Sequence, residues 1–274
     1  MEFGSIQLDL KSPQIMGVLN VTPDSFSDAG QYVSVEAAVL RALAMVEQGA
    51  TFIDIGGEST RPGAQLVSTE EELRRVIPVI EALREQSSVL VSIDTSKPEV
   101  MQQAILAGAA LINDVYALRK PGALETAARF DVPVCLMHMQ GSPEDMQKRP
   151  TYTHVVDEVI DFFKQRLLAC EGAGIARNKI LLDPGFGFGK TLSHNLTLLA
   201  ELSRLKELNC PLLAGLSRKS MLGAIIDKPV EQRLSASITA GLLALQNGAS
   251  ILRVHDVAET ADAVAIYNAV RQVR

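Results

Sequence analysis

Polar side chains of the kind that bind a flat heterocycle recur along this chain, each directly after a short apolar run. The clearest are Asp94, Asn113, Asp183 and Lys219. A carboxylate or an amide can bind two adjacent donors, so Asp and Asn suit a ring that carries several N–H groups. At these four positions the pattern favours a functional role over helix capping or exposure in a loop.

A second set of side chains is suited to an anion. It contains Arg61, Arg253 and His255, and the planar fork of arginine matches the oxygens of a phosphate. Asn20 offers a hard carbonyl oxygen, which is a suitable ligand for Mg²⁺ carried by a diphosphate. The two sets together predict a site for a polar heterocycle joined to a charged leaving group.

Eight apolar runs precede these residues and predict strands. They are QIMGVLN (14–20), QGATFIDIGG (48–57), SVLVSIDT (88–95), AGAALINDV (107–115), DVPVCLMH (131–138), AGIARNKILLDPG (173–185), NCPLLAGLS (209–217) and NGASILRVHD (247–256). None alternates cleanly, as expected of parallel strands buried on both faces. The strand ends also carry Glu58, His138, Ser217 and Arg218. For Asp54, Asp114 and Asp256 a capping or turn role is as well supported as a functional one.

Amphipathic segments between these runs predict helices, for example at 35–48, 69–85 and 155–171. Four glycines stand where helix C-caps belong, at Gly49, Gly108, Gly174 and Gly248. Eight strands alternating with helices over about 250 residues predict a (β/α)8 TIM barrel. We expect a single domain, 1–274, in which the first ten residues form a short hairpin-like extension that closes the barrel bottom. An open doubly wound sheet is the alternative, but no strand end carries a dinucleotide fingerprint.

The composition narrows the class of protein. The 274 residues are 47% hydrophobic and 21% charged, with a net charge of −6, which gives no electrostatic case for binding nucleic acid or an anionic membrane. No apolar run is long enough to predict a membrane-spanning helix, and the start of the chain does not read as a signal peptide. Cys135, Cys170 and Cys210 lack C-x-x-C spacing and predict buried free thiols in a reducing cytoplasm.

The stretch DPGFGFGKT (183–191) is similar to a phosphate-binding loop but does not match one. The pattern G-x-x-x-x-G-K-[ST] requires a glycine where this chain has Pro184, and proline removes an N–H that a phosphate would use. We therefore expect Lys190 to be a solvated or structural charge. The four histidines form no cluster, so a zinc site is not expected.

Eight blocks between residues 14 and 256 resemble those of dihydropteroate synthases, in the same order. They are NVTPDSFSD (20–28), GGESTRPGA (56–64), DTSKPEV (94–100), IND (112–114), LMHMQG (136–141), DPGFGFGK (183–190), LSRKS (216–220) and RVHD (253–256). The first two blocks are highly specific. Their spelling is similar to that of the sulfonamide-sensitive type of enzyme.

The resemblance implies one step of folate synthesis. A transferase joins 4-aminobenzoate to 6-hydroxymethyl-7,8-dihydropterin diphosphate, giving 7,8-dihydropteroate and diphosphate. It also implies a pterin-binding barrel, Mg²⁺ as cofactor, a cytoplasmic homodimer and sulfonamides as competitive inhibitors. We expect an SN1-like order, in which diphosphate leaves before the amine attacks.

The resemblance also implies roles for individual residues at matching positions. The pterin is bound by Asp94, Asn113, Met137, Asp183 and Lys219, and the diphosphate by Thr60, Arg61, Arg253 and His255. 4-Aminobenzoate contacts Phe26, Pro62, Phe188 and Ser220, while Asn20 ligates Mg²⁺. The catalytic residues are Asp94, Lys219, Arg61 and Asp183. The glycines of DPGFGFGK are expected to hold the backbone close beneath the pterin, where a side chain would collide with it.

Two other functions stay open. A pterin-dependent methyltransferase of the same fold would use the Asp and Asn side chains but needs no anion pocket. A non-catalytic pterin-binding or regulatory protein predicts loss of Asn20, Arg61 and Phe26, and all three are present.

Overall fold

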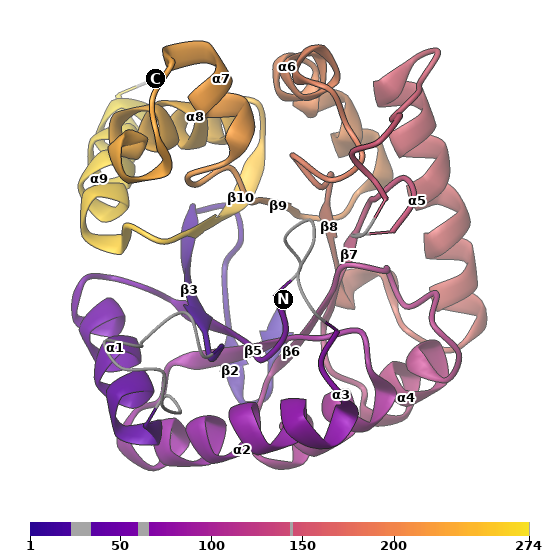
Figure 1. The fold of residues 1–274 in the computed structure, drawn as a ribbon, viewed down its shortest axis with the longest axis vertical. Helices are drawn as coiled ribbons and strands as arrows, with labels where there is room; N and C mark the ends of the chain where they lie inside the picture. The colour runs from indigo at the N-terminus through magenta and orange to yellow at the C-terminus, as the bar shows by residue number, and fades with distance from the viewer. Residues whose placement is uncertain (23–33, 60–65, 143–144, 274) are drawn as a thin grey trace.

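Eight parallel strands close into a barrel at the centre of the molecule, and helices surround it (Figure 1). The computed structural model describes residues 1–22, 34–59, 66–142 and 145–273. The barrel strands are β3 (Gln14–Asn20), β4 (Phe52–Gly56), β5 (Leu90–Asp94), β6 (Leu111–Asp114), β7 (Val134–Met137), β8 (Ile180–Asp183), β9 (Leu212–Ala214) and β10 (Ala249–Val254). They pair in sequence order, and β10 pairs with β3 to close the barrel. The predicted TIM barrel is confirmed, and the open sheet is excluded.

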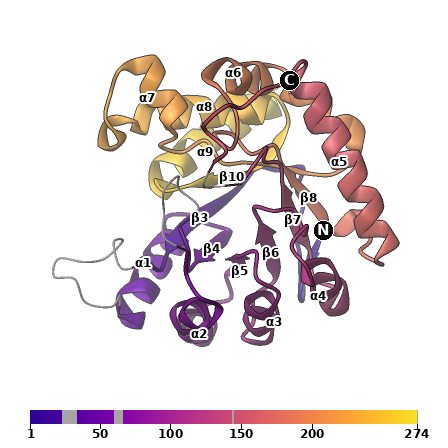
Figure 2. The same cartoon turned by 45° about the vertical axis from the view of Figure 1, so that its right-hand side comes forward.

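Helices connect the strands and form the outer layer of the fold (Figure 2). They are α1 (Val35–Glu47), α2 (Thr69–Gln86), α3 (Pro98–Leu106), α4 (Ala123–Phe130), α5 (Val155–Gly172), α6 (Leu192–Ala200), α7 (Ser220–Ile226), α8 (Leu234–Gln246) and α9 (Val257–Gln272), with short 3-10 helices η2 (Arg177–Lys179), η3 (Leu202–Leu208) and η4 (Val230–Gln232). Ser34 and Ser68 cap the first two helices, because each hydroxyl accepts an N–H from the first turn. The predicted glycines follow the C-caps of α1, α3, α5 and α8 with positive φ. Among the described residues, no helix has the length and apolar character needed to cross a membrane.

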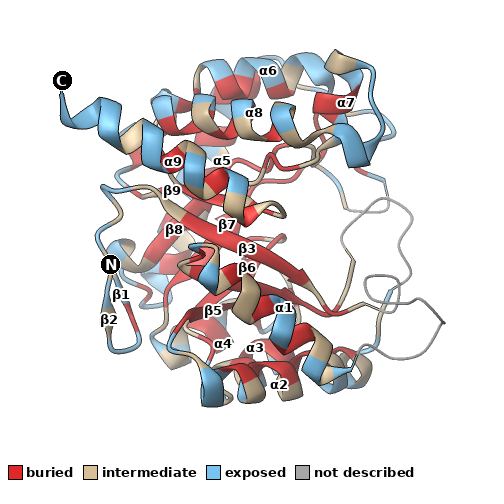
Figure 3. Cartoon of the chain, turned by 90° about the vertical axis from the view of Figure 1, so that its left-hand side faces the viewer, coloured by how far each residue is buried: buried red, intermediate tan, exposed pale blue. Residues whose placement is uncertain are grey.

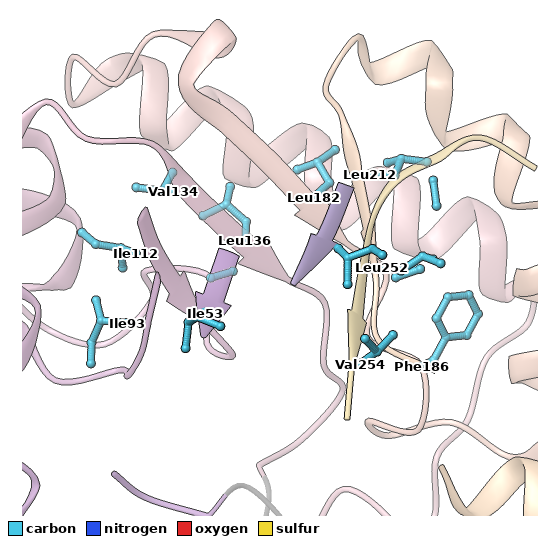
Figure 4. Close-up of a cluster of buried hydrophobic side chains, with 14 of the residues drawn as sticks. Ile53, Ile93, Ile112, Val134, Leu136, Leu182, Phe186, Leu212, Leu252 and Val254 are labelled. Carbon is cyan, nitrogen blue, oxygen red and sulfur yellow. The ribbon is translucent and has the colours of Figure 1, made fainter. Parts of the chain in front are cut away.

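Both faces of the barrel wall are buried (Figure 3). Side chains on the outer face, among them Ile53, Ile112 and Leu182, belong to one large apolar cluster with the helices (Figure 4). Because successive side chains of a strand point to opposite faces, the residues between them point into the barrel. This arrangement explains why the strand runs do not alternate in polarity.

The N-terminal hairpin closes one end of the barrel. Its strands, β1 (Glu2–Phe3) and β2 (Ile6–Gln7), are antiparallel. Phe3 is 1% exposed and packs edge-on against Phe52, with 5.0 Å between ring centroids. The apolar floor that Phe3 completes consists of Met16, Phe52, Leu90, Leu111, Cys135, Leu181, Leu213 and Ile251. The expected hairpin extension is therefore present. Above this apolar floor, polar side chains point into the barrel.

Candidate active site

The carboxyl ends of the strands bring together charged side chains that are far apart in the sequence. Arg253, on β10, donates from Nε to Asp54 Oδ2 at 2.6 Å and from Nη2 to Asp94 Oδ2 at 2.7 Å. Asn113 donates from Nδ2 to the same oxygen of Asp54 at 3.1 Å. The strand register supports this arrangement, since it places Asp94 directly opposite Asn113. Four strands thus contribute to one hydrogen-bonded cluster inside the barrel.

Burial sets the charge states of this cluster. Burial raises the pKa of Asp94 to about 7, against the effect of Arg253 and reinforced by the charge of Asp54. Burial alone lowers the pKa of Arg253, but Asp54 and Asp94 raise it overall, so the guanidinium stays charged. Asp54 is fully buried, and its Oδ1 has no hydrogen-bond partner in the described part of the chain. The cluster therefore holds a permanent cation between two carboxylates, one of which titrates near neutral pH.

Asp183 joins this cluster from the opposite side of the barrel. It ends β8, in register with Met137 at the end of β7. Its Oδ1 accepts the N–H of Gly185 at 2.7 Å. Burial raises the pKa of Asp183, while the Gly185 N–H and the charge of Lys219 oppose the rise. The carboxylate is thus held in one orientation by the first residues of its own loop.

An apolar wall borders the polar side chains. It consists of Val115, Met137, Met139 and Met146, with Tyr116 and Phe188 packed against it. Lys219 Nζ lies 4.2 Å from the centroid of the Phe188 ring, a cation–π contact. Lys219 is the N-cap residue of α7, and the exposed Ser220 begins that helix. The structure therefore brings Met137, Phe188 and Lys219 together next to the acidic cluster.

The loop after β10 is joined to the loop after β9. Ser217 Oγ accepts the backbone N–H of His255 at 3.2 Å and contacts its Nδ1 at 3.0 Å. Arg218, with φ of 57°, donates its N–H to Ser237 and forms a two-pronged ion pair with Asp256. The contacts with Ser217 hold His255 near the barrel mouth. The ion pair with Arg218 gives Asp256 a structural role.

The three aspartates whose roles the sequence leaves open take different positions. Asp54 lies at the centre of the acidic cluster. Asp114 is also fully buried, but it accepts the N–H groups of Tyr116 and Leu118, both at 2.8 Å, and shapes the loop after β6. Asp114 therefore has the structural role, and Asp54 belongs to the site.

His138 and Lys190 lie together behind the site. His138 follows a barrel strand, but its ring packs edge-on against Phe162 of α5, 4.8 Å between centroids, and not into the acidic cluster. Of the two roles expected for Lys190, the structural one is confirmed, since it is 3% exposed and its Nζ lies 2.9 Å from His138 Nδ1. Burial lowers the pKa of Lys190 to about 7, and burial with the nearby Lys190 charge lowers that of His138 to about 2.

Two glycines of DPGFGFGK let this loop approach the neighbouring loop after β7. A Cβ on Gly185 would lie 2.0 Å from the carbonyl oxygen of His138, and one on Gly189 would lie 2.4 Å from that of Gln140. Both residues have positive φ, of 68° and 59°. The expected close approach of the loop to the pterin stays a prediction.

A buried ion cluster beneath the loop after β4 has no signal in the sequence. Lys97 Nζ donates to Glu58 Oε2 at 2.7 Å and also binds Glu72, which is 1% exposed. Lys97 precedes α3 and Glu72 lies in the first turn of α2. Spacing alone shows neither partner, because both contacts depend on how the two helices pack against the barrel.

The remaining predicted site residues lie at the barrel mouth or outside the described residues. Asn20 ends β3, half-buried and in register with Gly56. Phe26, Thr60, Arg61 and Pro62 lie outside the residues that the structure describes. Within the described ranges, no group of three or more His, Cys, Asp or Glu side chains is arranged to hold a metal ion.

Comparisons with known proteins identify similar chains over nearly the whole length. Residues 16–255 match the family described as pterin binding enzyme. The dihydropteroate synthase of Escherichia coli K12 is 54% identical over 262 residues, which cover 96% of this chain and 93% of that protein. A structure of the Yersinia pestis dihydropteroate synthase with a sulfonamide drug complex has a TM-score of 0.95 and 52% identity, with 99% of each chain covered. A Xanthomonas albilineans dihydropteroate synthase in complex with 7,8-dihydropteroate has a TM-score of 0.88 and 52% identity, covering 96% of this chain and 95% of that one.

Proposed function

Because this chain belongs to the pterin binding enzyme family and is a transferase of the dihydropteroate synthase type, we propose how its residues perform that reaction. The substrates are 6-hydroxymethyl-7,8-dihydropterin diphosphate and 4-aminobenzoate, and the products are 7,8-dihydropteroate and diphosphate. The observation that carries the proposal is the cluster of Asp54, Asp94, Asn113 and Arg253, with Asp183 and Lys219 beside it, inside one barrel. It supplies the acceptors and donors that a flat, N–H-rich ring requires.

The pterin ring binds in the acidic cluster. Asp183 and Asn113 bond to the N–H groups and ring nitrogens, and Asp94 binds the opposite edge of the ring. The thioether of Met137 packs on the face of the ring, and the Lys219 ammonium donates to its oxo group and ring nitrogen. Asp54 Oδ1, which is buried and has no hydrogen-bond partner among the described residues, is a further acceptor within the same cluster.

The charges of the site favour an SN1-like order of bond changes. The C–O bond to diphosphate breaks first, and the leaving group takes the electron pair. Three carboxylates, of Asp54, Asp94 and Asp183, then face the positive ring, against the cations of Arg253 and Lys219. Preorganised negative groups stabilise such developing positive charge without reorganisation. The arylamine nitrogen then donates its lone pair to form the C–N bond and loses a proton.

Arg253 serves the pterin side of the site. Its guanidinium binds Asp54 and Asp94, whereas the resemblance assigns it to the diphosphate. We therefore propose that it mainly balances the charge of the acidic cluster. His255, which Ser217 holds near the barrel mouth, is then the candidate among the described residues for contact with diphosphate. We also propose that Thr60 and Arg61 bind the diphosphate.

Asn20, at the mouth of the barrel, is a suitable ligand for Mg²⁺ that arrives with the substrate. Asn20 presents a hard amide oxygen, and Mg²⁺ is commonly held by one or two protein oxygens together with substrate phosphates and waters. A dedicated cage of carboxylates is lacking among the described residues, which agrees with an ion shared with diphosphate. When bound there, Mg²⁺ would neutralise charge on the leaving group.

4-Aminobenzoate binds beside the pterin. We propose that Phe188 lies along its ring, that Ser220 receives its carboxylate, and that Phe26 and Pro62 complete the pocket. Sulfonamides compete for this position. The protein would act in the cytoplasm as a homodimer.

Formation of product from the two substrates tests the function. Purified protein with Mg²⁺ should form 7,8-dihydropteroate and diphosphate, and a sulfonamide should inhibit competitively with 4-aminobenzoate. Absence of 7,8-dihydropteroate would refute the assignment. Release of diphosphate without 4-aminobenzoate would support the SN1-like order, and C–O cleavage that strictly requires the amine would contradict it.

A further inference from the structure

Lys190 is a buried amine outside the acidic cluster. It is 3% exposed, and its Nζ donates to the carbonyl oxygens of Gly185 at 2.9 Å and Phe188 at 3.0 Å. Its third close contact is His138 Nδ1 at 2.9 Å. The ammonium therefore closes the loop 185–190 on itself and fastens it to the loop after β7.

Other side chains secure the same loop from outside. Tyr152 donates its hydroxyl to the carbonyl oxygen of Gly189 at 2.8 Å. Asn195, on α6, accepts the N–H of Gly187 at 2.8 Å and donates to the carbonyl oxygen of Lys190. The backbone of the loop is thus fixed by contacts that face away from the acidic cluster.

The loop presents one large side chain to the site. The Phe188 ring packs on the wall that contains Met137 and lies 4.2 Å from Lys219 Nζ. Lys190 bonds to the backbone of Phe188 itself, so the position of that ring depends directly on the ammonium. The backbone of Asp183 depends on it less, because it belongs to β8 and is in register with Met137. Asp183 contacts this loop through the N–H of Gly185, which donates to its Oδ1.

We propose that Lys190 is a positioning residue for the 4-aminobenzoate half of the site, acting through the backbone that carries Phe188. The inference rests on the proposed function. Without Lys190 Nζ, the carbonyl oxygens of Phe188 and His138 and the ring nitrogen His138 Nδ1 lose a donor, and the loop must rearrange to satisfy them, whereas Gly185 O keeps the N–H of Phe188. The pterin half, held by barrel strands, should stay in place.

Steady-state kinetics of Lys190→Met tests the proposal. A displacement of about 1 Å can cost up to about 100-fold, and we expect the KM for 4-aminobenzoate and the inhibition constant of a sulfonamide to rise about tenfold or more. The KM for the pterin diphosphate should change by less than about twofold. A purely structural role would not separate the two substrates in this way.

Lys179→Met is the matched control. Lys179 lies just before β8, at the other end of the same strand, where it binds Asp131, so both KM values should stay at those of the wild type. A Lys190→Met enzyme whose two KM values rise equally, or do not change, overturns the proposal.

A milder variant covers the case in which Lys190→Met does not fold. Tyr152→Phe removes one hydrogen bond to the same loop, and should raise the KM for 4-aminobenzoate about threefold without affecting the pterin. Equal or absent effects on the two substrates in this variant likewise overturn the proposal. If the wild type forms no product, the proposed function fails, and binding of each ligand to the three variants still decides the positioning role.

Discussion

The affinity of the site for a pterin should depend on the ionisation of Asp94. One of its oxygens already accepts a hydrogen bond from Arg253, and an ionised carboxylate has further lone pairs with which to accept an N–H of the ring. A protonated carboxyl group would present an O–H donor or a weaker acceptor at that place. We therefore expect the pterin to bind the ionised form of Asp94.

The raised pKa of Asp94 determines the size of the effect. Burial raises this pKa to about 7, so about 1% of the free protein is ionised at pH 5 and about 10% at pH 6. Because binding requires loss of a proton, affinity should increase as pH rises through 7. The expected change is about tenfold per pH unit below 7, and about 100-fold between pH 5 and pH 8.

Isothermal titration of a pterin without the diphosphate, at pH 5, 6, 7 and 8, measures this change. Asp94→Asn should reduce the dependence to the part that comes from Asp183, whose pKa burial also raises, and should weaken binding at pH 8 by about 10- to 100-fold, the loss expected for one charge-assisted hydrogen bond. Any change in the protonation of the pterin itself with pH is the same for both proteins and cancels when their affinities are compared. Asp114→Asn is the control, because burial also raises the pKa of Asp114, to about 6, but its carboxylate bonds only to its own loop.

Two results would refute the reasoning. One is a wild-type protein that binds the pterin equally well at pH 5 and pH 8. The other is an Asp94→Asn variant that keeps the wild-type slope, since some other group would then be responsible for it.

Three further outcomes can be measured. Arg253→Met should shift the midpoint of the same pH titration above 7, because Arg253 lowers the pKa of Asp94; an unchanged midpoint would contradict this. Lys97→Met should lower the free energy of unfolding in urea by about 3 kcal/mol, since Glu72, 1% exposed, loses its cation, and Lys97→Arg should recover part of the loss. Phe3→Ala should cost about 3 kcal/mol or more in the same assay; a marginal loss would show that the floor does not need this ring.

The barrel could be predicted from the sequence because each strand carries its own evidence. An apolar run and a polar end are local features, and so are glycines such as Gly49 and Gly248 after the helices. The polar strand ends of Asp94, Asn113 and Asp183 could be predicted for the same reason. Their convergence follows from parallel strands whose carboxyl ends share one side of the barrel.

The sequence did not predict which side chains pair with each other where the contact depends on barrel closure or on helix packing. Arg253 lies 199 residues from Asp54 and 159 from Asp94, and no spacing rule links residues so far apart. The sequence left Lys190 as a solvated or structural charge, and it could not decide between them because the acceptors of Lys190 are backbone carbonyl groups of its own loop. Residue types predict which groups can bind a ligand, but not which of them are already bound to one another.

The apolar floor and the acidic cluster depend on each other. Nine apolar side chains, including Phe3 and Cys135, fill the barrel below the cluster, so Asp54 and Asp94 are cut off from water on that side. This isolation is costly for carboxylates and requires a cation within bonding distance, which Arg253 supplies. The same low-polarity surroundings raise the pKa of Asp94 and would strengthen the interactions between these charges and the positive ring of the proposed mechanism. We therefore expect the floor to affect the proposed reaction without touching the substrate, because it determines how strongly the carboxylates above it can act.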